Sequence, residues 1–287
     1  MIRRLPLAAL LLQTTLCAQN QHALTAQQVI ELIQKNVGVP WATPTVDTIK
    51  AGDPNEPVTG IATTMMATLD VLERASAEGK NLVITHEPTF YSHLDKTDKL
   101  SEQHDSVLAF KEAFIREHHM VVWRFHDHWH RHRPDGILKG MVDALGWQKY
   151  QDPTNPSLFV MPPASLDELA TRVKHKLGIV AMRVVGNPSL TITKVGLIPG
   201  AAGSETQIKA LERDDVEALF IGEVPEWETV EYVADAATEN KPKALVMMTH
   251  IPSEQAGMDE CATWLKTFIS EVPISFVPAQ QPFWLPQ

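Results

Sequence analysis

The stretch Leu82-Val83-Ile84-Thr85-His86-Glu87-Pro88-Thr89 is a short apolar run that ends in Thr-His-X-Pro and a hydroxyl residue. The same design returns later as Leu245-Val246-Met247-Met248-Thr249-His250-Ile251-Pro252-Ser253. Such runs are typical of buried strands, and proline ends a strand without having to donate a hydrogen bond. A single histidine at a strand end is more often structural than a ligand. The repetition instead favours two functional histidines, His86 and His250, at the carboxyl edge of an α/β sheet.

The rest of the chain continues this alternation of strands and helices. The expected strands cover 58–66, 81–85, 120–125, 180–185, 191–197, 218–221, 244–248 and 274–277. The expected helices cover 25–36, 68–77, 105–118, 137–145, 165–177, 204–211, 227–237 and 254–269. This pattern predicts an α/β fold of two similar βα-rich halves, 19–150 and 151–287. No Gly/Ser-rich linker separates them, so we expect them to pack as one unit with the site in the cleft at the strand carboxyl ends.

The composition limits the classes of function. The chain has 287 residues and a formal net charge of −10, so no basic field exists to hold nucleic acid or an anionic membrane. It contains twelve histidines, and nine of them lie between His86 and His132. This concentration points to metal ligation more than to polyanion binding.

The amino terminus predicts export. Arg3 and Arg4 precede a short apolar run and small residues, which is the pattern of a cleaved signal peptide over 1–18. Alternatives are an apolar tail of a cytosolic protein and a lipoprotein anchored at Cys17, although bulky Leu16 disfavours lipidation. Without Cys17 the single thiol is Cys261, so any metal must be held by nitrogen and oxygen.

Two carboxylates accompany the repeated histidines. Glu254 lies four residues after His250, just inside a helix that we expect Ser253 to cap, and this spacing suits an imidazole–carboxylate metal pair. The alternative is that Glu254 only complements the helix dipole. Glu87 follows His86 directly and is a candidate ligand, bridging group or general base.

The segment 126–132, with the sequence His-Asp-His-Trp-His-Arg-His, is the third candidate element. If it is extended, alternation places its four histidines on one face and Asp127 on the other. Clustered neutral imidazoles favour metal binding. The alternative is an exposed histidine-rich loop with weak metal affinity.

The order of these motifs resembles the NGG-interacting-factor-three-like family, also known as dinuclear metal-centre hexameric proteins and type two homologues of GTP cyclohydrolase I. The resemblance covers about residues 25 to 280. The matching segments are Asp47–Pro54, Ile84–Tyr91, His126–His130, Pro199–Ser204, Ile221–Glu223 and Thr249–Glu254.

The resemblance implies two metal ions per chain. Their ligands would be His86, Glu87, His130, His250 and Glu254. His126 is a further candidate, and His128 is held in reserve. Glu87 stands where the family usually has His, and His130 where it usually has Asp. The number of imidazoles and carboxylates is thereby kept, which suggests a divergent, exported member.

These observations favour a metal-dependent hydrolase in which two divalent ions, zinc first and iron or manganese next, share a bridging water, with Glu87 as the catalytic residue. The alternative is a non-catalytic metal-binding or metal-delivery protein. A third reading leaves the histidines as surface decoration. The expected partners are an unidentified small-molecule substrate and, from the resemblance, further copies of the chain in a hexamer, with no nucleic acid and no membrane.

Overall fold

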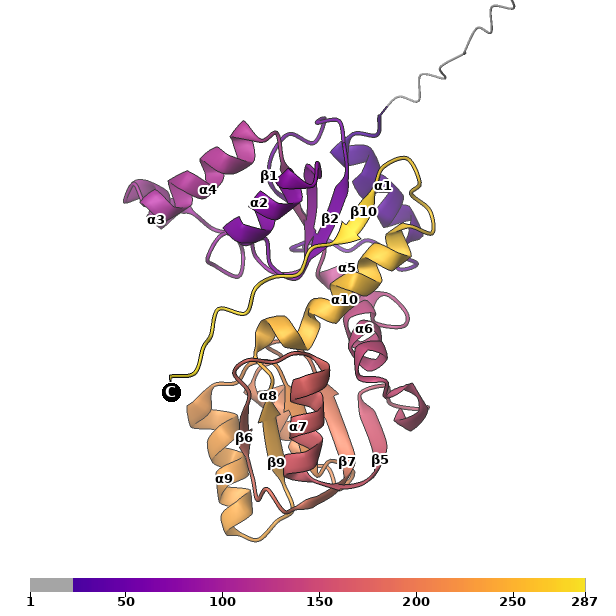
Figure 1. The fold of residues 1–287 in the computed structure, drawn as a ribbon, viewed down its shortest axis with the longest axis vertical. Coiled ribbons are helices and arrows are strands. Elements are labelled where there is room, and N and C mark those ends of the chain that lie inside the picture. Colours follow the sequence, from indigo (N-terminus) through magenta and orange to yellow (C-terminus); the bar gives the residue numbers. More distant parts are fainter. Residues whose placement is uncertain (1–22, 287) are drawn as a thin grey trace, which may run out of the picture.

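The structure is a computed structural model that describes residues 23–286. The expected signal peptide, residues 1–18 with Cys17, lies outside them. The described chain forms two five-stranded sheets with helix α10 (His250–Leu265) between the two halves (Figure 1). Among the described residues, no helix combines the length and the apolar character required to cross a bilayer. The predicted α/β fold of two halves is confirmed.

The first sheet has the strand order β1-β4-β3-β2-β10. All neighbours are parallel except β1 and β4. Its strands are β1 (Ile49–Ala51), β2 (Ile61–Thr64), β3 (Leu82–Thr85), β4 (Val121–Arg124) and β10 (Ile274–Phe276). Because β10 pairs with β2, the end of the chain returns to the first half, across the division that we placed near residue 150.

The second sheet has the order β5-β7-β8-β9-β6, with a parallel centre and antiparallel edges. Its strands are β5 (Leu158–Ser165), β6 (Arg183–Val185), β7 (Thr191–Ile198), β8 (Ala218–Ile221) and β9 (Ala244–Met247). Strands β2, β3, β4, β8 and β9 are buried along their whole length, since helices cover both faces of the sheets.

Local sequence accounts for several helix starts. The helices of the first half are α1 (Ala26–Asn36), α2 (Leu69–Ala77), α3 (Asp98–Glu102), α4 (Ser106–Glu117), α5 (Asp127–Arg131) and α6 (Gly136–Leu145). Those of the second are α7 (Leu166–Lys176), α8 (Ser204–Leu211) and α9 (Glu231–Thr238), with short turns η1 (Gln148–Tyr150) and η2 (Glu226–Val230). Capping boxes at Thr25 and Ser165 begin α1 and α7, and the side chain of Thr68 caps α2.

Helices α6 and α10 join the two halves. Side chains of α6 enter the cores on both sides, Ile137 in the first half and Met141 in the second. Close approach depends on glycine: a Cβ on Gly257 of α10 would lie 2.4 Å from the Cα of Ile137, and one on Gly140 would lie 2.3 Å from a backbone oxygen of α10. The two helices therefore contact almost backbone to backbone.

We predict that Gly257→Ala lowers the free energy of unfolding by about 2–3 kcal/mol, because the added methyl group forces α6 and α10 apart. Urea unfolding followed by circular dichroism measures this. Asp143→Ala, an exposed change on α6, should cost less than about 0.5 kcal/mol. Equal stability of the Gly257→Ala variant and the parent would contradict this account of the packing.

Candidate metal centre

The two repeated motifs meet between the sheets, as predicted. His86 and Glu87 follow β3, and His250 begins α10 after β9. The Nε2 atom of His250 lies 3.4 Å from Oε1 of Glu87 and 3.0 Å from Oε2 of Glu254. The Nε2 atom of His86 lies 3.7 Å from the same Glu254 oxygen. Two imidazoles and two carboxylates from opposite halves of the molecule thus face one point.

The start of α10 differs from our expectation that Ser253 caps a helix beginning at 254. The helix begins at His250, and Pro252 lies in its first turn, where a missing N–H costs nothing. The Ser253 hydroxyl instead donates to the carbonyl of His250 and accepts from the N–H of Gly200. His250 and Glu254 consequently stand one helical turn apart on the same face.

Gly200 makes room for the second carboxylate. Its φ is +71°, and a Cβ at this position would lie 2.2 Å from Oε1 of Glu254. A side chain here would displace the carboxylate, so Gly200 serves the site by leaving space for Glu254.

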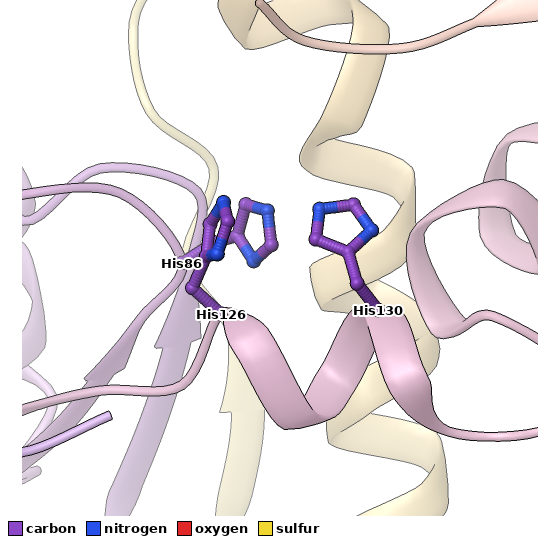
Figure 2. Close-up of side chains that lie close together, drawn as sticks. All are labelled: His86, His126 and His130. Atoms are coloured by element: carbon purple, nitrogen blue, oxygen red, sulfur yellow. The ribbon is translucent and has the colours of Figure 1, made fainter. Parts of the chain in front are cut away.

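The segment 126–132 is not extended, and this expectation was wrong. Residues 127–131 form the short helix α5, with His126 immediately before it. The helical period brings His126 and His130 to one side and turns His128 away. Figure 2 shows the rings of His86, His126 and His130 gathered at this helix, with centroids 4.5–4.9 Å apart.

The cause of the helix lies about 80 residues earlier in the chain. The buried carboxylate of Asp47 accepts hydrogen bonds from the N–H groups of His126, Asp127 and His128, and so satisfies the first turn of α5. It also contacts Nδ1 of His128 at 2.6 Å. The local sequence pattern cannot predict a helix whose cap lies so far away in the chain.

Four histidines share one arrangement. Each has an oxygen next to its Nδ1 atom, so with a metal bound Nδ1 would keep its proton and Nε2 would be the ligand atom. The partners are the Phe125 carbonyl for His86 (3.3 Å), Asp127 for His126 (3.0 Å), Asp135 for His130 (3.0 Å) and Glu223 for His250 (2.9 Å). This is the usual second layer of a metal-binding histidine.

His128 provides the contrast within the same cluster. Its Nδ1 contacts Asp47, its Nε2 accepts from the N–H of Ala42, and its ring stacks on Trp41. Both nitrogens are therefore occupied, and His128 is structural.

A buried charge network holds Glu87. Arg124, fully buried on β4, donates to Oε2 of Glu87 at 3.1 Å and to the carbonyls of His86 and His93. Asp95 lies 3.8 Å from Arg124 and 3.3 Å from Lys50. One Glu87 oxygen is thus fixed by the guanidinium, and the other faces His250 and His126.

The electrostatics of the cluster favour a cation. Burial works against charge on His250, but Glu223, Glu254 and Glu87 outweigh it and raise the pKa of this imidazole to about 12. Burial, together with neighbouring His126 and His130, lowers the pKa of His86. Burial opposes ionisation of Glu87, yet the hydrogen bond to His250 and the nearby cations lower the pKa of this carboxyl group. Glu87 therefore stays ionised beside a neutral His86.

These residues fit a metal ion. Two groups of ligand atoms lie within 4.8 Å of one another: His86 with His126 and His130, and His86 with Glu87 and Glu254. Nε2 of His86 is buried without a hydrogen-bond partner, and Nε2 of His250 and Oε2 of Glu254 are buried with no partner outside the ligand cluster. Such orphaned atoms are costly unless something coordinates them. Five of the six candidate ligands line a cavity of about 400 Å³ between the two halves, and His86 is the one that does not.

The six residues proposed as ligands from sequence are thus brought together. The sequence pattern did not reveal the groups that orient these ligands, which are Asp47, Asp135 and Arg124, and it gave Glu223 no role. Asp47 and Glu223 stand in segments noticed for their resemblance, and Asp135 could have been found as the N-cap of α6. Arg124 could have been noticed as a charge within an apolar strand.

The fold and the site define an α/β protein with a candidate His/Glu metal centre between two sheets. Residues 25–282 match the family described as Duf34/NIF3 (NGG1p interacting factor 3). The chain belongs to this family, and the predicted resemblance is confirmed.

Individual relatives are distant. A protein of Clostridium acetobutylicum described as a GTP cyclohydrolase 1 type 2 homolog is 25% identical over 198 residues, which cover 65% of this chain and 69% of the relative. Staphylococcus aureus protein SA1388 superposes with a TM-score of 0.69 at 16% identity, covering 92% of this chain and 99% of that one. Reduced HcgD from Methanocaldococcus jannaschii superposes with a TM-score of 0.64 at 14% identity, covering 88% of this chain and 97% of that one. These structures support the fold alone.

We predict that Asp47→Ala destabilises the protein by about 2–4 kcal/mol, because three backbone N–H groups and His128 lose a charged acceptor. Chemical denaturation measures the loss. Asp53→Ala, an exposed aspartate nearby, is the control and should change stability by less than about 0.5 kcal/mol. A stability for Asp47→Ala equal to the control would show that α5 does not depend on this cap.

Proposed function

We propose that this protein is a dinuclear metal-dependent hydrolase. The observation that carries the proposal is the convergence of four Nε2 atoms, each oriented by an oxygen on Nδ1, with the carboxylates of Glu87 and Glu254. His86, His126 and His130 would hold one ion. Glu87, Glu254 and His250 would hold the other, with His86 between the two groups.

The formal charge of the site supports two divalent ions. Apart from Asp95, whose charge is offset by Lys50, five carboxylates contact these histidines or Arg124, and the imidazoles are neutral when they act as ligands. The carboxylates belong to Glu87, Asp127, Asp135, Glu223 and Glu254. Arg124 offsets one of them, which leaves four negative charges. Two divalent cations would balance this charge, and nitrogen and oxygen donors suit zinc, iron or manganese.

Bound divalent ions would supply Lewis acidity and a hydroxide-like nucleophile from water near neutral pH. The protein's own groups would prepare the site for them. The Nδ1 partners fix the ring orientations, and Arg124 keeps Glu87 ionised and directed at His250. Because both Glu87 oxygens are engaged, we assign this residue to metal holding ahead of proton transfer. The cavity between the halves would admit a small substrate.

We predict close to two metal ions per chain in the purified protein. His250→Ala or Glu254→Ala should lose at least one ion, because each removes an atom of the ligand cluster. Inductively coupled plasma mass spectrometry measures the content. His175→Ala, an exposed histidine on α7, should keep both ions. Absence of bound metal from the untreated protein would overturn the centre.

The hydrolase proposal needs a separate measurement. At fixed metal content, the protein should turn over at least one of a panel of phosphoesters, cyclic amides and nucleotides many times. GTP belongs in the panel because a relative is described as a GTP cyclohydrolase 1 type 2 homolog. A loaded protein that binds two ions and turns over none of these substrates would favour metal binding or delivery without catalysis.

The assembly and the compartment are proposals that rest on sequence. We propose a homo-hexamer from the family resemblance. A molar mass equal to that of the monomer, measured by light scattering, would contradict this proposal. We propose export through residues 1–18, for which the basic and apolar start of the chain is the support. Mass spectrometry of the mature amino terminus tests that cleavage.

A further inference from the structure

The second half contains another cavity, of about 640 Å³, which shares no lining residue with the metal-centre cavity. Its volume lies within the roughly 300–1,000 Å³ typical of small-molecule sites. One wall is the carboxy-terminal part of α7, and the other is the segment 145–150, which runs from the last residue of α6 to the end of η1. Met161 and Pro162 of β5 also line it.

The interior of this cavity is apolar. Trp147, Met161, Leu169 and Val173 line it, and all four belong to the hydrophobic core of the second half. They remain reachable through the opening although each is at most 8% exposed. A ligand there would contact an apolar surface continuous with the core, which favours burial of a hydrocarbon or aromatic group.

The walls of the cavity are cationic. Arg172, His175 and Lys176 follow the spacing of one face of α7, and Lys149 stands on the opposite wall. No acidic residue lines the cavity, although the chain carries 35 acidic against 25 basic residues. Among residues 23–286, none of these four side chains forms a salt bridge.

The one acid on α7 near Arg172 is already engaged. Glu168 accepts from the N–H of Ser165 in the capping box that starts α7. Basic residues in a last helical turn also complement the helix dipole, which accounts for His175 and Lys176. It does not account for Lys149, which lies on another element and adds charge of the same sign across the cavity.

We propose that this cavity binds a small amphipathic anion, a free molecule with an apolar body and one anionic group. The apolar body would contact Trp147, Met161 and Leu169. The anionic group, a carboxylate or a phosphate, would be held by Arg172 and Lys176 from one wall and Lys149 from the other. This site does not depend on the metal centre.

Isothermal titration calorimetry with octanoate and octylammonium, below their micelle concentrations, tests the proposal because the two probes share a chain and differ in charge. Octanoate should bind at least about tenfold more tightly than octylammonium, and added salt should weaken it. The Arg172→Glu/Lys176→Glu double variant should lose at least about tenfold in octanoate affinity.

The matched control is Lys209→Glu/Lys266→Glu, which reverses two exposed charges at the ends of α8 and α10 and should leave octanoate binding unchanged. Unchanged circular dichroism spectra and unfolding midpoints of both double variants show that they are folded. Equal affinity for the two probes, no octanoate binding by the parent, or no effect of Arg172→Glu/Lys176→Glu would each overturn the proposal. Sedimentation with phosphatidylglycerol vesicles but no octanoate binding would also overturn it, in favour of a membrane-facing surface.

Discussion

The rest of the site depends on the burial of negative charge between the two halves. Glu87 and Glu254 are both buried, and His250 and His86 lie directly against them. Removing carboxylates from water is costly unless cations accompany them. Arg124 supplies one cation, and the raised pKa of His250 shows that the location still attracts positive charge. Metal ions would satisfy this demand with the geometry that four oriented imidazoles provide.

The fold delivers these groups through the ends of parallel strands. His86 follows β3, the 126–130 segment follows β4, and His250 follows β9 of the other sheet. The tight α6–α10 contact connects the two halves, because glycines at 140 and 257 let the two helix backbones pack directly against each other. A centre whose ligands come from both halves requires this connection. The contact between the helices is therefore part of the site, although neither glycine lies in it.

Much of this arrangement could be predicted from the chain. Apolar runs ending in Thr-His-X-Pro identify two strands and their shared edge, and capping residues locate α1, α2 and α7. Local pattern failed where a remote group decides the structure. From about 80 residues away, Asp47 stabilises residues 127–131 as a helix, and the backbone N–H of Gly200 donates to Ser253 inside α10. Arg124 and some of the Nδ1 partners also act through contacts between segments that are distant in the sequence. The sequence therefore reveals the candidate ligands but not the residues that orient them.

The central claim is that two ions are held through Nε2 of the four histidines. Anomalous diffraction from crystals of the purified protein, recorded on both sides of the absorption edge of the metal it contains, tests this most directly. The account predicts two adjacent peaks, with His86, His126, His130 and His250 bound through Nε2 and Nδ1 left on Phe125, Asp127, Asp135 and Glu223. A single peak, coordination through Nδ1, or a peak located away from Glu87 and Glu254 would contradict it.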